Sequence, residues 1–94
     1  MDCTILYFSR HAFERMFQRS IDPDTVLQVV ARGEVLANYP DDQPFPSVLM
    51  LGFHRGQPIH AVVARDQVTG NCHLVTVYRP DPAIWNEEFK QRRA

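Results

Sequence analysis

The sequence has few of the residues and segments that mark secreted, membrane or zinc-binding proteins. Its 94 residues include only two cysteines, Cys3 and Cys72. Two cysteines without a C-x-x-C pair make neither a disulfide framework nor a zinc knuckle, and they fit a reducing cytosol. The start MDCTILYF lacks the features of a signal peptide, and no segment approaches the roughly 20 apolar residues that span a bilayer. We therefore expect a cytoplasmic protein with no membrane contact.

An excess of either charge is also missing. Ten basic and eleven acidic residues give a net charge of -1, so no global field would draw a polyanion to the surface. Local basic patches remain open, because residues 43–80 carry three arginines against one acidic residue and the chain ends in QRRA.

The signature motifs of the common enzyme classes are absent. There is no H-E-x-x-H, no G-x-S-x-G and no glycine-rich phosphate loop. His54, His60, Cys72 and His73 are potential metal ligands. However, adjacent Cys72 and His73 would point to opposite faces of a strand, and no carboxylate joins them in a recognisable spacing. We expect neither a metal site nor a cofactor.

The length and the 45% hydrophobic content predict one domain, residues 1–94. Ser9 is a good N-cap for a helix that runs to about Arg19. A second helix is predicted by Asp22 as N-cap, Pro23 at the first position and Gly33 just past the end. These two helices precede most of the predicted strands.

Strand-like runs dominate the second half of the chain. A short strand or extended arm is expected at 4–9 and a strand at 34–39, followed by a proline-rich loop. Residues 47–53, 58–66 and 71–79 predict an antiparallel meander with short glycine-bearing turns, and their apolar character indicates that both sheet faces are partly covered. Asp81 and Pro82 indicate a short C-terminal helix. Together these elements predict an α+β fold with two N-terminal helices packed on an antiparallel β-sheet.

The first predicted helix carries His11, Arg15 and Arg19 at four-residue intervals, which places them on one face. Apolar residues, Ala12, Phe13, Met16 and Phe17, fill another arc, which we expect to dock on the sheet. The basic face is either a solvated outer surface or the wall of an anion-binding site, and the helix alone does not decide between them.

Several side chains suit RNA cleavage without a metal ion, which needs a base for the 2′-OH, an acid for the leaving oxygen and cations for the phosphorane. Each also has a structural interpretation: a solvated face for the helix residues, and a satisfied core histidine for the residue between Ile59 and Ala61. We expect the first helix to supply a hydrogen-bond partner to that histidine. The candidates are His11, His60 and Tyr78 as catalytic groups, Arg15, Arg19 and Arg79 as phosphate ligands, and Thr76 as a supporting residue.

The candidates on strands can form one site only if their side chains point to the same face of the sheet. If Asp66 pairs with Asn71 across the turn, His60 and Tyr78 point to opposite faces of the sheet. A single bulge would reverse this and place them on the same face.

The segments HAFERMFQRSI, RGEV, PIHAVV and LVTVYRPDPAIW, in this order, resemble the bacterial family called domain of unknown function 4258 over nearly the whole chain. Similar families are placed by fold near the small RelE-like and MqsR-like messenger-RNA interferase toxins, whose genes often lie beside a zinc-finger antitoxin. The resemblance implies a RelE-like architecture and a compact toxin-type endoribonuclease that acts on RNA and is held by a protein antitoxin. It singles out His11, Arg15, Arg19, His60, Thr76 and Tyr78.

The near-neutral charge departs from RelE-like toxins, which are strongly basic. The alternative is a non-catalytic protein-interaction module, in which the apolar second face of the sheet docks a partner. Convergence of His11 and His60 on one phosphate would separate the two interpretations.

Overall fold

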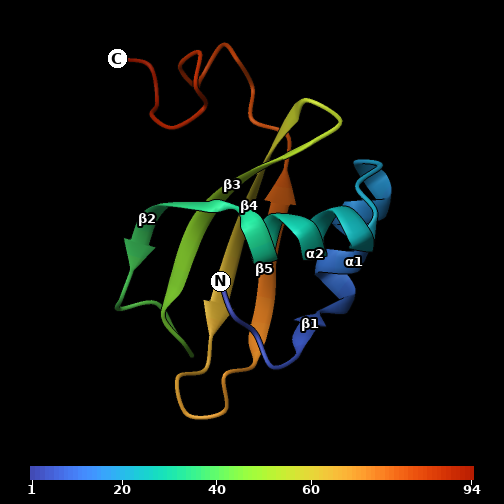
Figure 1. Ribbon diagram of the computed structural model, residues 1–94, viewed down its shortest axis with the longest axis vertical. Coiled ribbons are helices and arrows are strands. Elements are labelled where there is room, and N and C mark those ends of the chain that lie inside the picture. The colour runs from blue at the N-terminus through green and yellow to red at the C-terminus, as the bar shows by residue number, and fades with distance from the viewer.

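The computed structural model describes residues 1–94 and places two helices on one face of a five-stranded sheet (Figure 1). The α+β class is therefore confirmed. In chain order, the elements are β1 (Leu6–Phe8), α1 (Arg10–Gln18), α2 (Pro23–Arg32), β2 (Glu34–Tyr39), β3 (Ser47–His54), β4 (Gln57–Arg65) and β5 (Cys72–Tyr78).

Both helices begin at the predicted caps. The Ser9 hydroxyl accepts a hydrogen bond from the Ala12 N–H at 3.0 Å, and the Asp22 carboxylate accepts one from the Thr25 N–H at 2.8 Å. Each bond satisfies one of the N–H groups that the first helical turn leaves unpaired. Pro23 occupies the first position of α2, where a missing N–H costs nothing.

The strand order is β1-β5-β4-β3-β2, and β2 to β5 form the predicted antiparallel meander. The expectation of a purely antiparallel sheet is wrong, because β1 pairs with β5 in parallel, with Leu6 opposite Cys72. A parallel pair needs a long connection between its strands. Here that connection contains both helices and three strands, so no local turn signal marks the pairing.

The main core lies between the helices and the sheet. Ala12 and Met16 of α1 are buried there, whereas Phe13 and Phe17 are 50% and 86% exposed. The prediction that the whole apolar arc docks is therefore wrong. Ala12 and Met16 lie one above the other on the docked side, and each phenylalanine follows about 100° further round the helix. The other buried members of this core are Ile21, Val26, Val29, Val30, Met50, Ile59, Ala61, Val63, Cys72, Leu74 and Val77.

Gly52 sets how closely α2 approaches the sheet. A Cβ at this position would meet Val29 Cγ2 at 2.8 Å, which is shorter than a normal contact between carbon atoms. A larger residue would therefore push α2 away from β3.

The C-terminal segment, residues 80–94, contains no helix, so the predicted one is wrong. The N–H groups of Ile84 and Trp85 both donate to the Asp81 carbonyl at 2.9 Å, as an initiated turn would. The chain then reverses instead of continuing, with an isolated bridge between Trp85 and Arg92. Figure 1 shows this segment, in red, beyond the end of β5.

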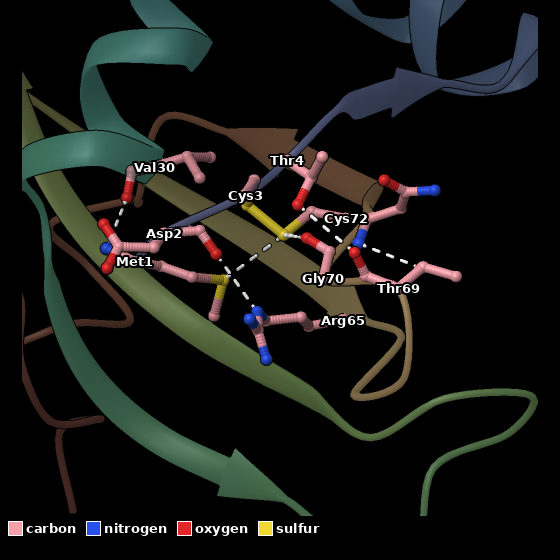
Figure 2. Close-up of a disulfide and its surroundings, with 10 residues drawn as sticks. Met1, Asp2, Cys3, Thr4, Val30, Arg65, Thr69, Gly70 and Cys72 are labelled. Carbon is pink, nitrogen blue, oxygen red and sulfur yellow. Dashed lines mark hydrogen bonds between the residues drawn. A yellow bond between two sulfur atoms is a disulfide. The ribbon is translucent and has the colours of Figure 1, made fainter.

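The two cysteines are joined in a disulfide and lie 69 positions apart in sequence. The expectation of two reduced cysteines is therefore wrong. Figure 2 shows Cys3 in the N-terminal arm and Cys72 at the start of β5. The arm is also held by the Met1 ammonium, which donates to the Val30 carbonyl at 2.9 Å, and by Arg65 Nε, which donates to the Asp2 carbonyl at 3.0 Å (Figure 2).

None of the helices combines the length and the apolar character that crossing a bilayer would require.

Candidate acid-base site

A bulge in the pairing of β4 with β5 brings His60 and Tyr78 directly opposite each other. Val62 pairs with Thr76 and Val63 with Leu74, which leaves Val75 as the extra residue. The register therefore shifts by one residue, and the bulge alternative of the sequence analysis is the one that the structure contains.

His60 and Tyr78 lie on the sheet face that points away from the helices. Ile59 and Ala61, on either side of His60, belong to the core beneath α1 and α2. Since successive side chains of a strand alternate between faces, His60 points the other way. Thr76 is two residues before Tyr78 and shares this face.

The His60 imidazole is 0% exposed, and both of its nitrogens have partners. Nε2 lies 2.7 Å from the carbonyl oxygen of Phe89, and Nδ1 lies 3.2 Å from Tyr78 Oη. A carbonyl only accepts, so Nε2 carries the hydrogen, and Nδ1 accepts from the Tyr78 hydroxyl. These partners assign the Nε2–H tautomer to His60.

Burial sets the charge states of both groups. It lowers the pKa of His60 below its usual 6.5, an effect that the hydrogen bond to Phe89 partly offsets. It raises the pKa of Tyr78 above 10.0. At neutral pH a protonated phenol therefore faces a neutral imidazole. Both shifts favour this neutral pair, and the hydrogen bond provides a path to His60 for the Tyr78 proton once Tyr78 receives another proton from a substrate.

The C-terminal segment covers this pair. The Trp85 ring meets the His60 ring edge-on, with 4.4 Å between centroids, and Arg92 lies 5.6 Å from the centre of the Trp85 ring. The charge of Arg92 acts to lower the pKa of Tyr78, against the effect of burial. Tyr78 is only partly buried and is the more accessible member of the pair.

Arg92, Trp85 and Phe89 were not among the predicted site residues. Phe89 is 29 residues from His60, and it contributes its backbone carbonyl rather than its side chain. No side-chain pattern identifies a carbonyl ligand, and the predicted C-terminal helix would have placed these residues differently.

His11 and Arg15 do not join this site. Both are exposed on α1, which packs on the opposite face of the sheet from His60. The expectation that the first helix supplies a partner to His60 is wrong, because Tyr78 and Phe89 are its partners. The two histidines therefore do not converge on one phosphate in this structure.

Arg19 and Arg79 join α1 to the end of β5. Arg19 Nη1 donates to the Val77 carbonyl at 2.7 Å. Arg79 donates through Nη1 to the Arg19 carbonyl and through Nη2 to the Ser20 carbonyl, the latter at 3.0 Å. The Arg79 guanidinium thus caps backbone carbonyls near the C-terminus of α1, where positive charge is favourable, whereas the Arg19 guanidinium ties this end of the helix to β5.

No three His, Cys, Asp or Glu side chains come close enough together to hold a metal ion. The hydrogen bond between Tyr78 and His60 supports proton transfer between these two side chains, beside the cationic side chain of Arg92.

The family model described as "Domain of unknown function (DUF4258)" matches residues 8–79. No curated protein and no solved structure matches the chain. The matched range contains His60 and Tyr78 and ends before the segment that covers them.

Proposed function

The chain belongs to the DUF4258 family, and from this premise we propose that it cleaves RNA without a metal ion, with Tyr78 and His60 as the proton-transfer pair. The observation that carries the proposal is the hydrogen bond from Tyr78 Oη to the neutral, buried Nδ1 of His60. The choice of RNA rests on the motifs that resemble this family, because similar families are placed by fold near the interferase toxins.

Tyr78 is the group that touches the substrate in this mechanism. The ribose 2′-OH gives its proton to Tyr78 Oη while the Tyr78 proton moves to His60 Nδ1. The 2′-oxygen bonds to phosphorus, the bond to the 5′-oxygen breaks, and water protonates the leaving oxygen. The hydroxide so formed then takes the proton back from His60 through Tyr78. The products are a 2′,3′-cyclic phosphate and a 5′-hydroxyl.

Two neighbours assist this transfer. The Phe89 carbonyl holds the Nε2–H, so Nδ1 always faces Tyr78. The Arg92 guanidinium supplies positive charge beside the developing phosphorane, as electrostatic stabilisation requires. His60 is fully buried, so it acts through Tyr78 and positions the proton rather than contacting RNA.

The test is cleavage of a single-stranded RNA oligonucleotide in the presence of a chelator. We expect products ending in 2′,3′-cyclic phosphate, detected by mass spectrometry, and no cleavage when the scissile nucleotide is 2′-deoxy. Tyr78→Phe and His60→Gln should each lose at least 100-fold in rate, about the contribution of one general acid or base. Arg32→Asn, which removes an exposed charge from α2, should cleave like the wild type.

The double variant His11→Ala with Arg15→Ala separates this site from one on α1. If this variant loses cleavage while Tyr78→Phe keeps it, the catalytic groups lie on α1 and the proposal is wrong. Cleavage that stops with chelator and returns with magnesium or zinc would also contradict it.

A second function, recognition of a protein partner, is favoured by the exposed aromatic rings of α1. Phe17 is 86% and Phe13 is 50% exposed. The cationic Arg15 lies on the same helix, as does Arg10, which pairs with Glu14 at 3.1 Å. We propose that an acidic amphipathic segment of a protein antitoxin, of the zinc-finger type that the resemblance implies, covers these rings. Opposite charge at the rim would select the partner and the rings would supply buried apolar area.

A further inference from the structure

A second polar site lies at the end of the sheet where β5 finishes. Figure 1 shows the β3–β4 turn, the end of β5 and the α1–α2 turn at the same end of the molecule. Between them is a cleft of about 330 Å³, lined mainly by Asp22, Thr25, His54, Arg55, Gln57 and Arg79. None of the positive charge in this cleft is needed for the proton transfer between Tyr78 and His60.

Arg55 occupies a backbone position that disfavours arginine. His54 pairs with Gln57, so Arg55 and Gly56 form a two-residue hairpin turn, with φ of 51° and 77°. Such turns favour asparagine or glycine at both positions, because a side chain with a Cβ crowds the backbone at positive φ. A residue that breaks a local rule without a structural gain is a candidate for function.

The Arg55 side chain makes no structural bond to repay this conformation. It is exposed and forms no side-chain hydrogen bond or ion pair, unlike Arg19 and Arg79. The same turn could be built at lower cost with asparagine. After the hydrogen bonds from Thr25, the charge of the Arg55 guanidinium also helps to lower the pKa of Asp22. This guanidinium binds no group directly, so all of its N–H donors are free for a ligand.

Arg79 presents a second, fixed guanidinium to the same cleft. Two of its N–H groups bind the carbonyls of Arg19 and Ser20. A guanidinium has five N–H donors, so others remain for a ligand. Asp22 is the one carboxylate in the cleft, and its Oδ1 already accepts from the N–H and the hydroxyl of Thr25. Two guanidinium groups and the His54 ring thus face a single, partnered carboxylate.

We propose that Arg55 and Arg79, with His54, bind a backbone phosphate of the RNA strand that Tyr78 attacks. This inference rests on the proposed function and names a substrate subsite. Guanidinium groups match phosphate oxygens in geometry and charge. Tyr78 and Arg79 are consecutive, with Cα atoms about 3.8 Å apart and side chains on opposite faces. A strand that crosses the end of β5 therefore meets both.

The experiment measures binding separately from cleavage. A fluorescent single-stranded 2′-O-methyl RNA, which has no free 2′-OH, is titrated with protein at several salt concentrations. Arg55→Asn should weaken binding by about tenfold and reduce the slope of log K against log salt by about 0.7, the value for one lost contact to a single strand. The melting temperature of this variant should equal or exceed that of the wild type, because asparagine suits positive φ.

Arg32→Asn is the matched control. It removes the same charge from the end of α2, outside the cleft, and it should bind the oligonucleotide with wild-type affinity and slope. If Arg55→Asn and Arg32→Asn behave alike, the loss is a general effect of charge and the subsite does not exist.

Other outcomes separate this inference from the proposed function. Binding that depends on Arg55, in a protein that fails to cleave the 2′-OH oligonucleotide, supports the subsite and refutes the nuclease mechanism. A wild type that does not bind the oligonucleotide overturns the subsite. A third outcome also overturns the subsite. In it, inorganic phosphate shifts the NMR signals of Arg55 and His54, but Arg55→Asn does not change the affinity for the oligonucleotide.

Discussion

At the scale of single residues, His60 combines complete burial with two satisfied ring nitrogens. Replacing it separates these two properties. His60→Ala leaves a cavity and removes the partner of the Tyr78 hydroxyl and of the Phe89 carbonyl, at a cost of about 1–3 kcal/mol in unfolding free energy. His60→Gln keeps a donor and an acceptor in similar volume and should lose less. Urea unfolding measures both losses, and equal losses would show that glutamine replaces neither the volume nor the hydrogen bonds of the imidazole.

The protonation of His60 gives stability a pH dependence with a defined sign. In the unfolded chain the ring binds a proton near pH 6.5, whereas burial lowers the pKa of His60 in the native state. Below pH 6.5 the unfolded state therefore holds more protons, and stability falls as the pH drops from 6.5 towards the native pKa. His60→Gln lacks this proton. The difference in melting temperature between wild type and His60→Gln should therefore shift in favour of the variant below pH 6.5, and a constant difference would contradict the assignment.

The burial or contacts of a residue were predictable where its sequence neighbours determine them. They were not predictable where residues far away in the sequence determine them. Ile59 and Ala61 on either side of His60 predicted its burial. The bulge was predicted only as an alternative. Which side chains of β4 and β5 share a face depends on the register of the two strands, and the sequence alone does not give that register. The roles of Arg19 and Arg79 in binding backbone carbonyls leave no trace in sequence, since any exposed arginine carries the same pattern.

At the scale of elements, the disulfide fixes the N-terminal arm and the edge strand that follows it. Cys3 and Cys72 are 69 residues apart in sequence, so the bond closes a long loop in the unfolded chain. Cys3→Ser should lower the unfolding free energy by about 2–4 kcal/mol, the typical effect of such a closure. Hydrogen exchange should show the largest loss of protection in β1. Reductant should destabilise the wild type and leave Cys3→Ser unchanged.

The C-terminal segment is the element that keeps His60 out of water. Trp85 is 8% exposed and its ring contacts the imidazole edge-on. Trp85→Ala should therefore admit water and raise the pKa of His60 towards 6.5, which NMR titration of the ring protons would show. Arg32→Asn should leave that titration unchanged. An unaltered pKa in Trp85→Ala would mean that the strands alone bury His60.

Elements with local start and stop signals were predicted well. The α2 bounds follow from Asp22, Pro23 and Gly33, and the three meander strands follow from short turns between apolar runs. The direction of β1 was missed because parallel pairing with β5 depends on the whole path of the chain. The C-terminal helix was predicted wrongly because capping residues start a turn but do not decide whether the chain continues in it.

At the scale of the whole molecule, the sheet separates the two proposed functional surfaces. The helices cover one face, and the C-terminal segment covers part of the other, which confirms that both faces are partly covered. The exposed rings of α1 lie on the helical side, and the Tyr78 hydroxyl bonds to His60 on the other. The proposed partner-binding site and the proposed cleavage site can therefore be altered independently.

This separation gives the last prediction. Phe17 is 86% exposed, so Phe17→Ser should change the unfolding free energy by less than about 0.5 kcal/mol. With the neighbouring reading frame co-expressed as the candidate antitoxin, Phe17→Ser should fail to copurify with it yet cleave RNA at the wild-type rate. Tyr78→Phe should copurify normally and fail to cleave. The two sites lie on opposite faces and share no contacting residues. The double variant should therefore lose both copurification and cleavage, each to the same extent as in the single variants. A Phe17→Ser protein that loses cleavage at unchanged stability would show that α1 and the Tyr78 site act as one surface.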